Sequence, residues 1–251
     1  MKRITALQEM RAYRRLFGGE SVGFVPTMGA LHEGHASLIR RARLENQHVV
    51  VSIYVNPTQF NNADDLAKYP RPIEKDLELA DEAGADVVWT PEYDELYPDA
   101  YRYKVTESEV SKTLEGEFRP GHFDGMLSVV LKLLNGAQPT RAYFGEKDWQ
   151  QLSLVRGMVE ALLVPTEIVP VATLREADGL AMSSRNVRLS DAERKIAPLL
   201  HQVLTQVDDP ARGTQILTEK GFRVEYIREW DGRRLAAAWL GNVRLIDNVE
   251  I

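Results

Sequence analysis

Two histidines three residues apart form the pattern in this sequence that is best suited to chemistry. His32 and His35 lie in "FVPTMGALHEGHASLI" (24–39), after an apolar run and next to the glycines Gly29 and Gly34. A strand, a glycine turn and a helix start in this order create an anion site, because the first backbone N–H groups and the helix dipole favour negative charge. Two imidazoles beside such a site can stabilise charge that builds up on a phosphate. We therefore interpret the histidines as functional, in preference to the alternative that they only pack.

Two familiar motifs come close to this stretch but do not match it. A nucleotide-binding phosphate loop needs Lys and then Ser or Thr after its second glycine, whereas His35 and Ala36 follow Gly34. The missing hydroxyl is the Mg²⁺ ligand that γ-phosphoryl transfer uses. A zinc-protease helix needs His-Glu-x-x-His, and here the second histidine comes one position early with no third ligand nearby. The pattern therefore argues against a kinase and against a metalloprotease.

The overall composition narrows the class of protein further. The chain has 251 residues, a formal net charge of −6 and no cysteine. The negative charge argues against general binding to nucleic acid or to anionic membranes. The lack of cysteine excludes thiol nucleophiles and Cys-based metal sites, and no apolar run approaches the ~18 residues of a membrane span. We expect a cytoplasmic globular protein that binds neither nucleic acid nor membrane.

Strand and helix patterns alternate along most of the chain. Short apolar strands are predicted at 22–25, 48–55, 86–89, 141–145 and 167–171, and helices at 5–17, 36–45, 73–84, 125–135 and 148–163. The run 48–55 is apolar on both faces, which is typical of a central parallel strand. The alternation predicts an α/β fold, a Rossmann-like doubly wound parallel sheet with ligands at the carboxyl ends of its strands.

The pattern changes after about residue 174. Ser190 and Glu193 predict a capped helix for "LSDAERKIAPLLHQVL", "DDPARG" reads as a brief link, and "WDG" indicates a hairpin turn between two strands. We therefore predict two domains, 1–173 with the Rossmann-like sheet and 174–251 as a smaller α+β domain.

A second motif supports a particular class of phosphate chemistry. His32-x-Gly34-His35 resembles the HIGH signature of the nucleotidyltransferase superfamily, whose enzymes attack the α-phosphate of ATP with a carboxylate or phosphate and expel pyrophosphate. That superfamily pairs it with a KMSKS-like motif, and "GLAMSSRN" (179–186) matches this motif with Arg185 in place of the final Lys-Ser. The two motifs occur in the expected order, which indicates an adenylation enzyme.

Longer strings resemble one family within that superfamily. "VPTMGALHEGH", "SIYVNPTQF", "LEGEFRPGHFDG", "FGEKDWQQL", "DGLAMSSRN" and "AAWLGNVRLIDN" are similar to the pantothenate synthetase (pantoate–β-alanine ligase) family, in its order and over nearly the whole chain. The resemblance implies ATP-dependent condensation of (R)-pantoate with β-alanine through a pantoyl adenylate, releasing pyrophosphate and AMP. It also implies Mg²⁺ with ATP, a homodimer, a domain 1–173 that binds nucleotide and pantoate, and a domain 174–251 that acts as a lid.

The resemblance implies roles for particular residues. His35, assisted by His32, hydrogen-bonds or protonates phosphate oxygens in the transition state, and Lys147 and Arg185 are the other catalytic residues. The residues implied for ATP are Met28, Gly29, Ala30, Leu31, His32, Glu33, Gly34, His35, Gly145, Glu146, Lys147, Asp148, Leu174, Met182, Ser183, Ser184 and Arg185.

Glutamine is the residue type implied for the small hydroxy acid. Gln59 and Gln151 are the implied pantoate ligands, with Gln59 also next to β-alanine, and Thr27 and Met28 line the substrate side. A neutral amide suits this role, because it orients a carboxylate without quenching its nucleophilicity as a tight ion pair would.

The residues around the phosphates also have chemical reasons to be there. Lys147 carries a cation toward them, with a solvated surface charge as the alternative, and Gly145 permits close backbone approach. Asp148 caps the next helix or binds ribose hydroxyls. Residues 183–185 offer two hydroxyls and a guanidinium to the β- and γ-phosphates as pyrophosphate leaves.

Three further residues receive predictions with open alternatives. Asp76 helps to hold Mg²⁺, or it is a solvated carboxylate on a helix. Arg119 and His122, in "FRPGHFDG", shape the pocket and its loop. The region between "RKIAP" and "AAWLGNVRLIDN" looks trimmed for the family.

Two other function classes remain to be weighed. Another adenylyl- or cytidylyltransferase of the superfamily would bind a phosphorylated acceptor and should show an extra basic cluster, whereas "NPTQFNNADD" is polar with acidic residues. An RNA-binding protein on a synthetase scaffold should show a basic stripe, which this chain lacks.

Overall fold

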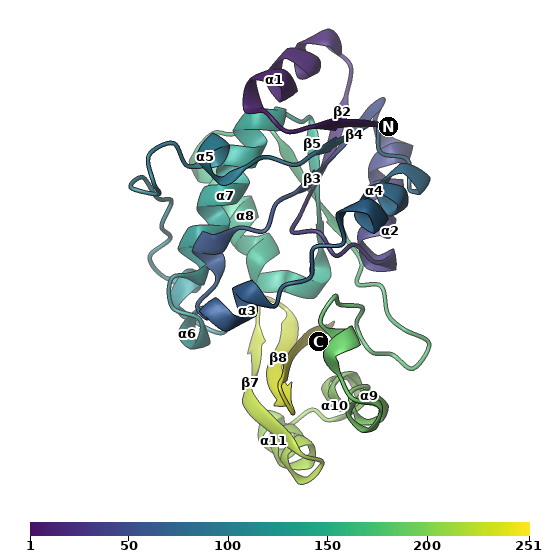
Figure 1. Cartoon of the computed structure of the whole chain (residues 1–251). Coiled ribbons are helices and arrows are strands. Elements are labelled where there is room, and N and C mark those ends of the chain that lie inside the picture. The colour runs from purple at the N-terminus through teal and green to yellow at the C-terminus, as the bar shows by residue number, and fades with distance from the viewer. The chain divides into compact units, whose positions relative to one another are not determined.

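The structure is a computed structural model that describes all residues Met1–Ile251 (Figure 1). The chain forms two compact units. The first consists of Met1–Gly145 and Gln150–Val171, and the second of Glu146–Trp149 and Ala172–Ile251. The assignment of 1–173 as the nucleotide- and pantoate-binding domain and of 174–251 as a lid stays a prediction.

The first unit is built on a six-stranded parallel sheet with the order β1-β4-β3-β2-β5-β6. The strands are β1 (Lys2–Ile4), β2 (Val22–Thr27), β3 (His48–Ile53), β4 (Val87–Trp89), β5 (Arg141–Gly145) and β6 (Glu167–Val171). This order confirms the predicted doubly wound sheet. β1 is the one strand that the sequence pattern missed, because three residues that include Lys2 and Arg3 are too short to show a periodicity.

Helices cover both faces of this sheet (Figure 1). The helices α2 (Glu33–Glu45) and α4 (Ile73–Glu82) lie on one side, and α7 (His122–Ala137) and α8 (Trp149–Ala161) on the other. The shorter elements of the unit are α1 (Leu7–Leu16), η1 (Pro57–Gln59), α3 (Ala63–Ala67), α5 (Tyr93–Leu96), η2 (Val110–Lys112) and α6 (Glu115–Phe118). None of the helices in the structure combines the length and the apolar character that a bilayer crossing demands.

The core explains why the helices lie where they do. α2 directs Ala36, Ile39 and Ala42 at the sheet, and each of these side chains has no exposed surface. Their spacing at positions i, i+3 and i+6 forms one apolar stripe of a helix. β3 is buried on both faces, as its uninterrupted apolar run predicted.

The second unit contains a three-stranded antiparallel sheet, β7-β8-β9, with helices packed on it. Its elements are η3 (Glu146–Asp148), η4 (Asn186–Arg188), α9 (Asp191–Ile196), α10 (Leu199–Gln206), α11 (Pro210–Glu219), β7 (Phe222–Trp230), β8 (Arg233–Leu240) and β9 (Val243–Glu250). The "WDG" turn is confirmed: Asp231 and Gly232 both have positive φ, 53° and 71°, as a type I′ hairpin requires.

The helices of this unit confirm one prediction and correct two others. Ser190 and Glu193 form the predicted capping box. The helix expected over 189–204 is interrupted at Pro198, because proline removes a backbone donor. "DDPARG" is not a brief link: Asp209 accepts a hydrogen bond from the Ala211 N–H and Pro210 occupies the first position of α11, so this string starts a helix.

Tyr143 ties β5 to the end of α2 through a buried phenol. Its hydroxyl donates to Glu45 Oε2 at 2.9 Å and accepts from Asn46 Nδ2 at 2.7 Å. Burial, and then the neighbouring Glu45 carboxylate, raises the pKa of Tyr143 to about 12. The phenol therefore stays protonated in the folded protein at a pH where it ionises in the unfolded chain.

This shift predicts a loss of stability at alkaline pH. Above pH ~10 the unfolded chain releases the Tyr143 proton and the folded protein keeps it, so the free energy of unfolding falls as the pH rises toward about 12. The contribution is at most about 1.4 kcal/mol per pH unit for one group. Urea unfolding between pH 8 and 11.5 should show a shallower decline for Tyr143→Phe than for the parent. Tyr103→Phe, at a side chain that is 77% exposed, should leave the slope unchanged.

Candidate functional site

The reversal of strand order in the first unit defines where a ligand is expected. β2 pairs with β5, through Gly23 with Arg141 and Phe24 with Ala142, and the order runs outward from these two strands in both directions. Doubly wound sheets bind their ligands at the carboxyl ends of such strands. β2 leads directly into the loop 28–32, and β5 ends at Gly145, two residues before Lys147. Both predicted phosphate-binding segments therefore follow the strands that border the switch point.

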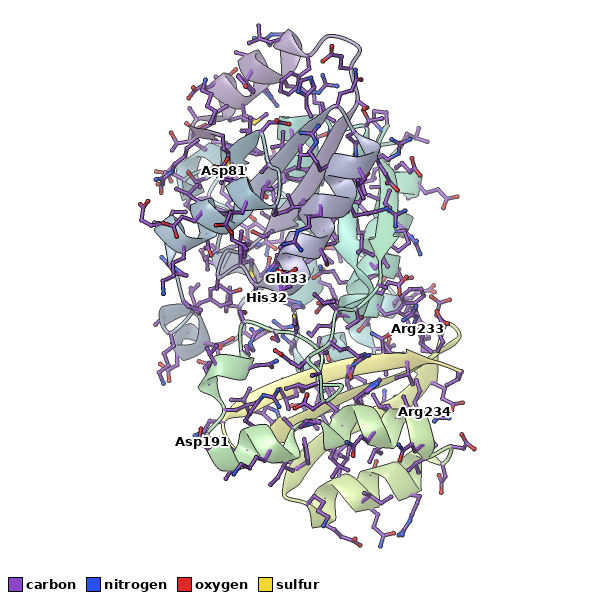
Figure 2. The ribbon with its side chains drawn as sticks, turned by 90° about the vertical axis from the view of Figure 1, so that its right-hand side faces the viewer. His32, Glu33, Asp81, Asp191, Arg233 and Arg234 are labelled. Atoms are coloured by element: carbon purple, nitrogen blue, oxygen red, sulfur yellow. The ribbon has the colours of Figure 1, made fainter.

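The two histidines close the start of α2 by capping each other's backbone. His32 is the N-cap residue, and its Nδ1 accepts a hydrogen bond from the Gly34 N–H at 3.1 Å. The Nδ1 of His35 accepts from the His32 N–H at 3.3 Å. The rings lie 4.1 Å apart between centroids, with 45° between their planes. Figure 2 labels His32 and Glu33 at this end of α2. Imidazole thus takes the place that Ser and Glu hold in the common capping box.

This arrangement determines the tautomer of both rings. A ring nitrogen that accepts a hydrogen bond carries no hydrogen, so each neutral imidazole has its proton on Nε2. Nε2–H is a donor suited to an anionic oxygen. An imidazolium carries a hydrogen on both ring nitrogens, so either ring would have to break its cap at Nδ1 to become charged.

Glu33 and the glycines of the loop have local roles of their own. The Glu33 side chain pairs with Arg40, two turns further along the same face of α2, and the Arg40 hydrogen bond lowers the pKa of its carboxyl. Gly29 has φ +77°, and a Cβ there would lie 2.9 Å from an oxygen of Asp76. Glycine is therefore required at this position both by the backbone conformation and by the close approach of the carboxylate.

Asp76 is a buried anchor for the loop, and the alternative of a solvated carboxylate is wrong. The side chain is 2% exposed. One oxygen accepts from the Ala30 N–H at 2.8 Å and the other from the Leu31 N–H at 2.7 Å. Ala30 has φ +50°, so the carboxylate stabilises a turn that the backbone does not favour on its own. Burial raises the pKa of Asp76, and the two backbone hydrogen bonds oppose this rise. Its predicted role as a Mg²⁺ ligand stays a prediction.

Replacing the Asp76 carboxylate distinguishes its role as an anchor of the loop from its predicted role as a Mg²⁺ ligand. Asp76→Asn turns one acceptor into a donor that faces a backbone N–H, and a hydrogen bond to a charged group is worth about 1.5–3 kcal/mol. We expect the predicted pyrophosphate release to fall about tenfold or more, with an unchanged dependence on Mg²⁺ concentration. Asp81→Asn, on the same helix with a side chain that is 62% exposed, is the matched control. Restoration of the rate by excess Mg²⁺ would instead identify Asp76 as a metal ligand.

A network of amides fixes the orientation of Gln59. Asn56, which has no exposed surface, donates from Nδ2 to the Gly125 carbonyl at 3.1 Å and to Gln59 Oε1 at 2.9 Å. Its Oδ1 accepts from the Tyr97 hydroxyl at 2.9 Å. Because Gly125 offers only an acceptor, the Asn56 amide can face only one way, and it takes Oε1 of Gln59 and leaves Nε2 for another partner. That atom lies 3.2 Å from Met28 Sδ.

Two further contacts support the predicted substrate residues. His122, 6% exposed, donates from Nδ1 to the Gln59 carbonyl at 2.7 Å, so it holds the loop that carries Gln59. Thr27 donates to the Ser52 carbonyl at 2.7 Å, and thereby joins the carboxyl ends of β2 and β3.

Arg119 lies 3.7 Å from Glu115 in the neighbouring turn. Gln151 is half-buried on α8, whereas its neighbour Gln150 is used to bind the 110–115 backbone.

The buried phenol of Tyr97 is the member of this network that donates to Asn56 Oδ1. Tyr97→Phe removes one hydrogen bond to Asn56 while keeping the ring packed, at a net value of about 0.5–1.5 kcal/mol. We expect the KM for the predicted carboxylate substrate to rise about two- to tenfold, with a smaller change in kcat. Initial rates against substrate concentration will measure this. Tyr93→Phe, on a side chain that is 38% exposed, should match the parent. An equal effect of both variants would contradict the idea that Tyr97 orients Gln59 through Asn56.

In the second unit, Lys147 lies in the short helix η3. Its side chain is 19% exposed, which disfavours the fully solvated alternative, and Nζ lies 3.9 Å from Asp148. Glu146 pairs with Arg233 of β8 at 2.9 Å. A Cβ at Gly145 would meet no atom within 4 Å, so packing within the chain does not require glycine there, and close approach by a ligand stays a prediction.

The loop 172–185 folds back on itself and brings together residues that the sequence predicted to share a ligand. The Met182 N–H donates to the Leu174 carbonyl at 3.0 Å. Arg175 and Ala181 form an isolated bridge, and Asn186 Nδ2 donates to the Ala181 carbonyl at 3.0 Å. The Ser183 hydroxyl accepts from the Arg185 N–H at 3.2 Å, which orders the turn that carries both.

Sequence reasoning missed several residues that position the site. Asn56 and Tyr97 hold Gln59, and Asn248 of β9 holds the Lys147 turn. The spacing Asn56-x-x-Gln59 directly after a central strand was a usable signal for the first of these. Tyr97 and Asn248 had none, because both act across more than 35 positions of sequence.

Comparison with known proteins is consistent over the whole chain. The family model described as pantoate-beta-alanine ligase matches residues 1–250. A pantothenate synthetase of Bdellovibrio bacteriovorus is 55% identical over 97% of this chain and 96% of its own. A second pantothenate synthetase, from Aquifex aeolicus, is 45% identical over 100% of this chain and 98% of its own.

Solved structures give the same result. A pantoate-beta-alanine ligase of Francisella tularensis, complexed with beta-gamma ATP and beta-alanine, has a TM-score of 0.95 and 39% identity, and covers 100% of this chain and 97% of that one. The pantothenate synthetase of Thermus thermophilus gives a TM-score of 0.90 at 42% identity, with coverage of 100% and 99%. These chains are matched almost end to end, and the trimming expected in the C-terminal region stays a prediction.

Proposed function

This chain belongs to the pantoate-beta-alanine ligase family, and we propose how its residues carry out the reaction. It is an ATP-dependent ligase that joins pantoate to β-alanine. The observation that carries the proposal is the pair of histidines whose Nδ1 atoms cap the start of α2. Neutral rings with hydrogen on Nε2 suit an attack at the α-phosphate, where negative charge grows on the phosphate oxygens.

The first step forms pantoyl adenylate. A carboxylate oxygen of pantoate attacks the α-phosphorus of ATP, the new P–O bond forms, and the bond from phosphorus to the bridging β-oxygen breaks as pyrophosphate leaves. His35, assisted by His32, donates hydrogen bonds from Nε2 to the α-phosphate oxygens. The loop 28–35, held by Asp76, keeps these rings at the N-terminus of α2, where the helix dipole favours the same anion.

Pantoate is held by amides and by the end of β2. Gln59 donates from Nε2, the amide atom that Asn56 does not bind, and Gln151 supplies a second amide from α8. Thr27 and Met28 line the substrate side. Neutral donors orient the carboxylate and leave it nucleophilic.

The second unit contributes the positive charge for the leaving group. Lys147 and Arg185 offer cations, and Ser183 and Ser184 offer hydroxyls, to the β- and γ-phosphates. Gly145, Glu146, Asp148, Leu174 and Met182 complete the nucleotide contacts. In this proposal residues 174–251 act as a lid that brings the loop 172–185 to ATP.

The second step completes the ligation without a covalent enzyme intermediate. The amine of β-alanine attacks the acyl carbon of pantoyl adenylate, the C–N bond forms, and the C–O bond to AMP breaks while the amine loses a proton. AMP is the leaving group, and pantothenate is the product. Gln59, at the pantoate carboxylate, is also the residue proposed to lie beside β-alanine.

Magnesium enters this proposal as a companion of ATP. Both Asp76 oxygens already accept backbone hydrogen bonds, and the structure has no group of three His, Asp or Glu side chains that could hold a metal ion. The donor set therefore does not fit a metal site built by the protein alone, and we propose that Mg²⁺ is held by phosphate oxygens. The homodimer, the cytoplasmic location and the absence of a nucleic-acid partner rest on the resemblance and on composition, and stay predictions.

A coupled assay tests the reaction and the histidine role together. Pyrophosphate release should require ATP, Mg²⁺ and pantoate, and AMP release should rise when β-alanine is added. His35→Asn should lower pyrophosphate release by about 100-fold or more, the range for losing one donor to a developing anion. His48→Asn, at the amino end of β3 where the ring pairs with Glu20, is the control. Release that proceeds without pantoate, or a normal rate for His35→Asn, would contradict the proposal.

A further inference from the structure

Two adjacent polar residues are buried in β9, within the string "NVRLIDN" to which the proposed mechanism assigns no role. Asp247 is 4% exposed and Asn248 is 2% exposed. Neighbouring residues of a strand point to opposite faces of the sheet. Asp247 lies opposite Ala236 and Asn248 opposite Leu235 in β8. Buried polar side chains are costly unless they are hydrogen-bonded, so their partners indicate what they do.

Asn248 binds the backbone of the Lys147 turn. Its Nδ2 donates to the Glu146 carbonyl and to the Lys147 carbonyl, both at 2.9 Å. Its Oδ1 accepts from Arg233 Nη1 at 2.8 Å. Since Arg233 can only donate, the amide can face only one way, and its two N–H groups match two consecutive carbonyls.

Arg233 supports the same turn from the same side. It pairs with Glu146 at 2.9 Å, and its guanidinium lies 4.0 Å from the centroid of the Trp149 ring. Trp149 Nε1 in turn donates to Asp231 in the β7–β8 turn at 3.1 Å. Figure 2 labels Arg233 at its position on β8. Every residue of the segment 146–149 except Asp148 is therefore tied to β8, β9 or the turn between β7 and β8.

Asp247 holds the other nucleotide segment of this unit. It accepts from Arg175 at 2.7 and 2.9 Å, and Arg175 also donates to the Gly179 carbonyl at 3.1 Å. His201 of α10, whose Nδ1 lies 3.5 Å from the carboxylate, and Arg175 offset the burial of Asp247 and leave the pKa of its carboxyl below its usual value. The two segments of the second unit that are proposed to bind phosphates, 146–149 and 172–185, are thus held by adjacent residues of one strand, Asn248 and Asp247.

We propose that Asn248 is a positioning residue for Lys147. The inference rests on the proposed role of Lys147 at the phosphates. Lys147 precedes α8 in a turn of only three residues, and its side chain can be directed reproducibly only if the backbone from which it starts is held. Asn248 holds that backbone from a strand that is paired along its whole length, and a displacement of about 1 Å at a catalytic group can cost on the order of 100-fold in rate.

A double-mutant cycle tests this inference. Asn248→Ala should lower kcat for pantoate-dependent pyrophosphate release by about tenfold or more while changing the KM for pantoate little. In a Lys147→Ala background the same substitution should lower the rate less than about twofold, because the group that it positions is gone. Asn242→Ala, in the exposed turn before β9, is the matched control and should behave as the parent.

The outcomes separate this inference from the proposed function. A normal rate for Asn248→Ala, or an equal loss in both backgrounds, would overturn the positioning role alone. A normal rate for Lys147→Ala in a pantoate-dependent enzyme would remove the role of Lys147, and this inference with it. If thermal unfolding shows that Asn248→Ala does not fold, Asn248→Asp keeps the side-chain volume and the acceptor for Arg233 but replaces both donors, and the same losses are expected of it.

Discussion

A carboxylate buried beside a glycine turn is the constraint on which the candidate site depends. Asp76 is removed from water, and burial alone disfavours its charged form. The Ala30 and Leu31 N–H groups offset that cost, and in return the turn keeps the positive φ of Gly29 and Ala30. The end of this turn sets where α2 begins, and hence where the two histidine rings cap it. The chemistry proposed for the rings therefore depends on the carboxylate that holds this turn.

The same principle recurs in the other parts of the site. Asn56 has its orientation dictated by the Gly125 carbonyl, and it dictates that of Gln59. Asn248 has its orientation dictated by Arg233, and it holds the Lys147 turn. In each case a buried amide lies between a group that offers only one hydrogen-bonding role and a residue of the candidate site. Such amides determine which atom of the final residue faces the ligand, which apolar packing cannot do.

Much of the fold followed from the sequence because its signals are local. The apolar run of β3, the stripe of α2, the Ser190 cap and the Asp231-Gly232 turn each depend on residues close together in the chain. β1 was missed because it is too short for a periodicity, and α11 because its start signals were interpreted as a link. The candidate site residues were predicted from motifs, whereas their supports were not. Asn248 acts across 101 positions on Lys147, and no periodicity or spacing reports a contact of that range.

The membership of Glu146–Trp149 in the second unit changes how this protein can be divided. The chain passes between the units at Gly145, at Trp149 and again at Val171, so the second unit is not a simple C-terminal appendage. A fragment that ends at Val171 would keep Lys147 but lose the side chains of Asn248 and Arg233 that bind its turn. A fragment that begins at Ala172 would keep those side chains without their partner segment. Neither piece is a self-contained module, so deletion, domain exchange and circular permutation have to respect three crossings of the chain instead of one.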